Sequence, residues 1–191
     1  MVSQINDLNS LIQGLADKIE THLINIRRDI HAHPETAFEE VRTASVVSKE
    51  LTTLGIDHQT GIGGTGVLGF IKGGYPGPTL VIRADMDALP IEEQTGLPFS
   101  STIKGKMHAC GHDLHTSTLI GIGAVLKSIA PRLHGNVKLM FQPAEETQES
   151  GARAMIKEGI LDHADFALGF HNHPDSPIGT LSGMILCVMP P

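Results

Sequence analysis

Residues 107–113, MHACGHD, gather metal-ligand side chains in a glycine-bearing loop just before a predicted helix. Thiolate sulfur and imidazole nitrogen are common zinc ligands. Alternate side chains of an extended chain share a face, so Cys110 and His112 are expected to point to the same side. The helix N-terminus would help to keep the Cys110 thiol deprotonated. The alternative for this segment alone is a buried cysteine beside incidental histidines.

Two adjacent carboxylates, Glu145 and Glu146, follow the apolar run 137–141 and the Gln-Pro that ends it. In α/β sheets, ligand crevices form at such strand ends. A metallohydrolase needs one carboxylate to coordinate metal and another to accept a proton from the attacking water. Neighbouring glutamates can divide these tasks. A solvated acidic turn is the alternative, and the commoner outcome for an isolated Glu-Glu pair.

Two further segments carry ligand-type side chains at predicted strand ends: residues 169–174, GFHNHP, and residues 83–90, RADMDALP. His171 could complete a metal site, and Asp85 could accept the second ring N–H of a ligand histidine and fix its tautomer. A surface histidine loop is the alternative for the first segment, and a helix cap or turn is the alternative for Asp85 or Asp87. The co-occurrence of four such loops favours a shared site.

The elements that must position these loops alternate between helices and strands, which indicates a layered α/β sheet. Helices are expected where apolar residues recur at steps of three and four, and strands where short apolar runs lie between turn residues. The predicted helices cover 5–30, 38–54, 114–129 and 152–158. The predicted strands cover 65–72, 79–82, 137–141 and 166–170, with a last one from about 179 onward.

Composition excludes several classes of function. The chain has 191 residues, 40% of them apolar and 18% charged, which is typical of a globular protein. A net charge of −7, no tryptophan and scattered basic residues argue against a nucleic-acid partner. No signal peptide is evident, and no apolar stretch approaches the roughly 20 residues of a membrane span. Two cysteines are too few for a disulfide framework, so a cytoplasmic protein is expected.

Taken together, these motifs make the chain resemble the aminoacylase/carboxypeptidase-type metallopeptidases. The similarity is strongest to the branch of indole-acetyl-amino acid hydrolases, hippurate hydrolases and N-acyl-L-amino acid amidohydrolases. Five segments carry it and span nearly the whole chain: 27–35 (RRDIHAHPE), 83–90, 108–113, 143–146 and 169–174.

The resemblance implies two divalent ions, zinc or manganese in the first place and cobalt or nickel as further options. It also implies a small-molecule N-acyl amino acid as substrate, split at its amide bond. The residues and their implied roles are Cys110 as the ligand bridging both ions, His112, Glu146 and His171 as terminal ligands, Glu145 as general base, and Asp85 as the residue orienting a ligand histidine. His31, His33 and Glu35 belong to the family signature and are assigned to scaffolding.

The implied fold is a layered α/β/α sheet of the zinc-exopeptidase type, present as an incomplete catalytic domain. Family members are about twice as long, so residues 1–191 would be the N-terminal part. A lid domain for homodimerisation and the rest of the catalytic domain would be absent, together with a last histidine ligand and a lid histidine. The isolated chain is therefore expected to be poorly active. The alternatives are a dipeptide or oligopeptide exopeptidase, and a truncated fragment that binds metal without catalysis.

Overall fold

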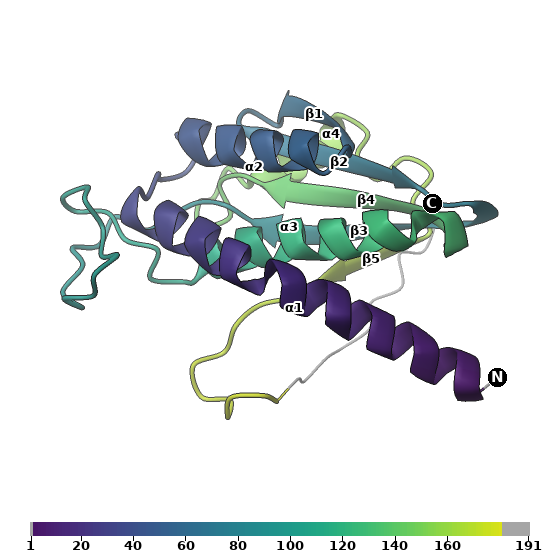
Figure 1. The fold of residues 1–191 in the computed structure, drawn as a ribbon. Helices are drawn as coiled ribbons and strands as arrows, with labels where there is room; N and C mark the ends of the chain where they lie inside the picture. Colours follow the sequence, from purple (N-terminus) through teal and green to yellow (C-terminus); the bar gives the residue numbers. More distant parts are fainter. Residues whose placement is uncertain (1, 181–191) are drawn as a thin grey trace.

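The computed structural model describes residues 2–180, with side chains from residue 7 onward. The helices are α1 (Val2–Ala32), α2 (Val41–Thr53), α3 (His112–Ile129) and α4 (Gly151–Lys157), with a 3₁₀ turn at Ala130–Arg132. The strands are β1 (Asp57–Ile62), β2 (Gly66–Lys72), β3 (Tyr75–Asp85), β4 (His134–Gln142) and β5 (Phe166–Gly169). They form one five-stranded sheet in the order β1-β2-β4-β3-β5 (Figure 1).

The sheet is mixed, and its parallel part determines where the loops meet. β1, β2 and β4 pair antiparallel, whereas β4, β3 and β5 run parallel. At the carboxyl ends of the parallel strands, Asp85 of β3 lies opposite Gln142 of β4, and Arg83 lies opposite Gly169 of β5. The segments that follow these three strands therefore leave the sheet at the same edge.

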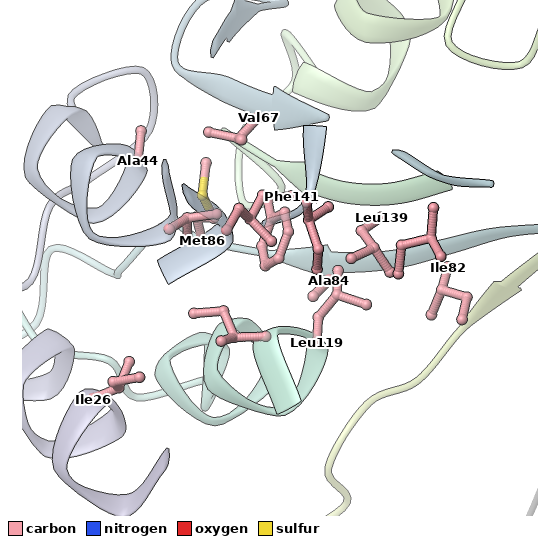
Figure 2. Close-up of a cluster of buried hydrophobic side chains, with 14 of the residues drawn as sticks. Ile26, Ala44, Val67, Ile82, Ala84, Met86, Leu119, Leu139 and Phe141 are labelled. Atoms are coloured by element: carbon pink, nitrogen blue, oxygen red, sulfur yellow. The ribbon is translucent and has the colours of Figure 1, made fainter. Parts of the chain in front are cut away.

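Helices cover both faces of the sheet, as the layered α/β/α prediction requires. Alternate side chains of a strand point to opposite faces. Ile82 and Leu139 belong to the main core under α1, α2 and α3, whereas their neighbours Val81 and Met140 pack with Met155 of α4 on the other face (Figures 1 and 2). The predicted fold class is therefore confirmed.

Helix α3 lies between α1 and the sheet and is held there by two close approaches. A Cβ on Gly121 would lie 2.5 Å from the Leu23 side chain of α1, and a Cβ on Gly123 would lie 2.8 Å from the Leu139 side chain of β4. Larger side chains at these glycines would require Leu23 and Leu139 to move aside. The glycines thus allow close packing of the helix whose first turn carries His112.

The predicted helices and four of the predicted strands are present, but β3 and β4 are longer than the predicted ranges 79–82 and 137–141. The sequence does not predict β1, because this edge strand is mostly exposed and lacks the apolar pattern of a buried strand. The strands at 65–72 and 79–82 are not neighbours, because β4 lies between them. The strand expected from about 179 onward lies outside the described residues, apart from its first two. Within the described part, no helix is long and apolar enough to cross a membrane.

Phe141 offers a direct test of the main core, because its side chain is fully buried in β4. Replacing it by alanine leaves a cavity, so Phe141→Ala is expected to lower the free energy of unfolding by about 3–5 kcal/mol. Phe70→Ala is the matched control, since Phe70 of β2 is 39% exposed, and its loss is expected to stay below about 1 kcal/mol. Urea denaturation of both variants measures the difference. Equal losses would contradict this assignment of the core.

Candidate metal centre

The cluster of ligand-type side chains lies at the carboxyl edge of β3, β4 and β5. His112 is the first residue of α3, Glu145 and Glu146 follow β4, and His171 follows β5. Ligand atoms of Cys110, His112 and His171 lie within 4.8 Å of one another, and so do those of His112, Glu145 and Glu146. His112 belongs to both groups and joins them into one cluster. The structure thus brings together five residues from three segments that are far apart in the sequence.

The individual distances within the cluster are short. The Cys110 sulfur lies 3.3 Å from Nε2 of His171, and Nε2 of His112 lies 3.8 Å from a Glu146 carboxylate oxygen. The His112 and His171 rings meet edge to face, with 5.9 Å between their centroids. The arrangement offers sulfur, nitrogen and oxygen ligand atoms to a cation.

His112 is oriented by Asp87. The ring is fully buried, and its Nδ1 lies 2.8 Å from the Asp87 carbonyl oxygen and 3.2 Å from the Asp87 carboxylate. Nδ1–H donates to these oxygens, so Nε2 presents its lone pair to the cluster. Among the described residues, Nε2 has no hydrogen-bond partner. Burial alone would lower the pKa of His112, but the hydrogen bond to Asp87 and the nearby carboxylates raise it.

The structure places Asp87, and not Asp85, at Nδ1 of His112. Asp85 lies 3.7 Å from Nε2 of His112 and bonds instead to Nδ1 of His115, at 2.6 Å. Its second carboxylate oxygen lies 2.7 Å from the Arg83 guanidinium. Burial alone would raise the pKa of Asp85, but the hydrogen bond from His115 and the charge of Arg83 hold it below its ordinary value. Asp85 and Asp87 are two residues apart, and sequence alone does not tell which of them meets the ligand histidine.

Cys110 and His112 are brought together by a turn at Gly111. The extended chain predicted from the Cys-x-His spacing is not present. Gly111 has a left-handed backbone, with φ of 87°, and forms the N-cap of α3. A Cβ at this position would also lie 2.4 Å from the Asn172 side chain. Glycine is thus required by the backbone conformation and by the close approach of the loop after β5.

The surroundings of the Cys110 thiol favour its protonated form as long as no cation is bound. Burial, reinforced by the neighbouring Glu146 carboxylate, raises the pKa of the Cys110 thiol to about 12. A thiolate here needs the compensating charge of a cation.

The donor set fits divalent cations. It combines one sulfur, two imidazoles and several carboxylates, and it includes the unpartnered Nε2 of the buried His112. Mixed sulfur, nitrogen and oxygen ligands suit zinc and leave other first-row metals possible.

Glu40 anchors the loop that carries Glu145 and Glu146 by a hydrogen bond to its backbone. Ala144 has a left-handed backbone, with φ of 48°, and its N–H donates to the fully buried Glu40 carboxylate at 2.8 Å. Burial raises the pKa of Glu40. The Glu145 side chain, 39% exposed, lies 4.0 Å from the Arg83 guanidinium. Sequence reasoning missed Glu40, because nothing in its surroundings marks it as more than a helix-end acid.

The residues assigned to scaffolding lie outside the ligand cluster. The Glu35 carboxylate accepts the N–H groups of Arg42 and Thr43 at the start of α2. The His31 ring lies between the carboxylates of Asp113 and Glu93, at 2.9 and 3.3 Å. Asp113 directly follows His112, so His31 supports the first turn of α3.

Known proteins are similar to this chain in sequence and fold. The sequence pattern of peptidase family M20/M25/M40 matches residues 81–185. N-acetylcysteine deacetylase of Bacillus subtilis (strain 168) is 47% identical over 173 residues, which cover 87% of this chain and 44% of the relative. Thermostable carboxypeptidase 1 of Saccharolobus solfataricus is 40% identical over 185 residues, covering 94% of this chain and 47% of the relative.

Among solved structures, the Bacillus subtilis YXEP protein is described as a dinuclear metal binding peptidase from the M20 family. It matches with a TM-score of 0.82 and 45% identity, over 85% of this chain and 46% of its own. The chain thus spans less than half the length of these relatives.

The His31 contacts predict a pH-dependent contribution to stability. The hydrogen bond to Asp113, and next to it the Glu93 carboxylate, raise the pKa of His31 above its ordinary value of 6.5 despite burial. A raised histidine pKa stabilises the fold fully below 6.5, and this contribution is lost as the pH rises through the folded-state value. The pKa of Asp113 is lowered, so the Asp113 carboxylate becomes protonated, and its pairing with His31 is lost, only at much lower pH.

We therefore expect the difference in free energy of unfolding between the unaltered chain and His31→Gln to shrink as the pH rises above 6.5. Chelator-treated protein, unfolded in urea at several pH values, gives the measurement. His22→Gln is the control, since the His22 side chain is 60% exposed. A difference that stays constant or grows with pH would contradict the assignment.

Proposed function

The chain belongs to peptidase family M20/M25/M40, and on this basis we propose that it carries the catalytic centre of a metal-dependent hydrolase of N-acyl amino acids. The reaction splits the amide bond with water and yields a carboxylic acid and a free amino acid. Relatives named as an N-acetylcysteine deacetylase support this substrate class.

One observation carries the proposal: the convergence of Cys110, His112, Glu146 and His171 beside Glu145. In this assignment, Cys110, His112, Glu146 and His171 would hold two divalent cations, with the Cys110 thiolate shared between them. The unpartnered Nε2 of His112 supports its place in the set. Zinc or manganese suits the mixed donors best, and cobalt or nickel would also be accepted.

The proton transfer is assigned to Glu145. Bound divalent cations would lower the pKa of the attacking water and polarise the scissile carbonyl. Glu145 accepts a proton from this water as its oxygen adds to the carbonyl carbon. Protonated Glu145 then returns the proton to the amide nitrogen as the C–N bond breaks. The partly exposed position of Glu145 supports this role, because substrate and water must reach its carboxylate.

Two other functions compete with the proposal. A dipeptide or oligopeptide exopeptidase would use the same centre, and the relative named as a carboxypeptidase supports it. The other competitor is a fragment that binds metal without turnover. Metal analysis, combined with assays on acetyl-amino acids, benzoyl-amino acids and dipeptides, separates the three.

Several wider expectations stay predictions. They are that residues 1–191 form the N-terminal part of a catalytic domain, that the isolated chain is poorly active, that the longer protein is a homodimer, and that it works in the cytoplasm. The short coverage of the relatives supports the first two.

Replacing Glu145 tests the division of tasks between the two glutamates. Glu145→Gln keeps the side-chain shape but cannot accept a proton, so turnover is expected to fall by about 100-fold or more, while metal content stays unchanged. Glu149→Gln, an exposed substitution in the same loop, should leave both unchanged. Metal analysis and acyl amino acid hydrolysis are the measurements. Loss of metal together with activity would refute the assignment of Glu145 as base.

A further inference from the structure

We propose that His115 is a positioning residue that holds the His171 segment against the cluster, and that it is not a ligand itself. The proposal rests on the proposed function in taking His171 as a ligand. His115 lies close enough to Asp85 and His112 to form a third group of metal-ligand type. The hydrogen bonds of its ring show what it does instead.

Both ring nitrogens of His115 are occupied by hydrogen bonds. Nδ1 lies 2.6 Å from the Asp85 carboxylate, and the backbone N–H of Asn172 donates to Nε2 at 3.0 Å. A nitrogen that accepts an N–H carries no proton, so the ring is the neutral tautomer with its proton on Nδ1. The side chain is 1% exposed. No lone pair is left for a cation.

The two neighbouring histidines differ from His115 in this respect. Nδ1 of His112 is bound to the Asp87 carbonyl at 2.8 Å, and Nδ1 of His171 to the Asn172 carbonyl at 2.6 Å. In both rings Nε2 is directed into the cluster, and the one in His171 lies 3.3 Å from the Cys110 sulfur. Two rings are thus oriented for binding a cation, whereas the ring of His115 serves as a link.

The His171 segment depends on this link, because the strand before it offers little support. β5 has four residues, is largely exposed and, in the described part, pairs only with β3 at the sheet edge. His115 contacts both neighbours of His171: Phe170 lies edge to face with its ring at 5.7 Å, and Asn172 binds its Nε2. The backbone on both sides of the proposed ligand therefore rests on one buried imidazole.

The other end of the link is anchored in the sheet. Asp85, the last residue of β3, bonds to His115 and pairs with the Arg83 guanidinium at 2.7 Å. Its carbonyl also accepts the hydroxyl of Thr116 at 2.8 Å. A continuous chain of contacts thus runs from β3 through the first turn of α3 to the loop after β5. Loss of such a supporting partner typically weakens metal binding by about 10- to 100-fold.

Two isosteric substitutions separate the two hydrogen bonds. The amide nitrogen of His115→Asn can replace Nδ1 and donate to Asp85, but nothing remains to accept the Asn172 N–H. The amide oxygen of His115→Gln can replace Nε2 and accept the Asn172 N–H, but the donor to Asp85 is lost. A positioning role for the His171 segment predicts that glutamine substitutes better than asparagine. If His115 acted only through its hydrogen bond to Asp85, asparagine would substitute better than glutamine.

The experiment measures cobalt(II) binding to the full chain through the thiolate-to-cobalt absorption band, together with hydrogen exchange of residues 170–174 in the metal-free chain. We expect His115→Asn to weaken cobalt binding by about 10- to 100-fold and to speed exchange in this segment, with His115→Gln closer to the unaltered chain. Ser117→Ala is the control, since among the described residues the Ser117 hydroxyl bonds only to the Leu114 carbonyl within α3.

Three results would overturn the proposal: unchanged binding and exchange in both variants, a larger loss with glutamine than with asparagine, or loss of one whole equivalent of cobalt in both. The last would make His115 a ligand. If the unaltered chain binds no cobalt, the proposed function fails, whereas hydrogen exchange still decides whether His115 holds the segment. The two failures are therefore distinguishable.

Discussion

The candidate centre depends on the pairing of two aspartates with two histidines. Asp85 and Asp87 lie two residues apart where β3 ends, and His112 and His115 lie three residues apart on the first turn of α3. Each carboxylate binds Nδ1 of one ring, so the helix start cannot shift along the strand end without breaking both bonds. The same pairs give the rings different tasks, because Nε2 of one faces the cluster and Nε2 of the other binds the loop after β5.

Charge is the second constraint on this edge of the sheet. Aspartates, glutamates and a thiol crowd together around few cationic groups, of which the Arg83 guanidinium is the nearest to both Asp85 and Glu145. Negative charge that is removed from water without compensation is costly. Burial, together with this crowding, raises the pKa of the Cys110 thiol. Divalent cations bound in the cluster would compensate the negative charge and lower the pKa of this thiol. The same side chains repel one another without cations and would be stabilised together by them.

The sequence was sufficient to predict the layered fold and the convergence of the ligand-type residues, because parallel strands bring their carboxyl ends to one edge. It was insufficient for details decided by local backbone geometry. Whether Asp85 or Asp87 orients His112 depends on how the chain turns beyond β3. The left-handed conformation of Gly111 replaces the extended geometry that the Cys-x-His spacing suggested. The linking role of His115 depends on a backbone N–H 57 residues away, which no local pattern reveals.

The difference between the two adjacent glutamates also follows from the backbone. The N–H of Glu146 donates to the Asp87 carboxylate at 3.0 Å, so the group that orients His112 also fixes the proposed ligand Glu146. Glu145 precedes this anchor and follows Ala144, whose left-handed backbone turns the chain at the end of β4. Its carboxylate is left 39% exposed beside Arg83. The backbone thus anchors Glu146 through its N–H and leaves the Glu145 carboxylate accessible, which supports the proposed roles of Glu146 as a ligand and Glu145 as the base.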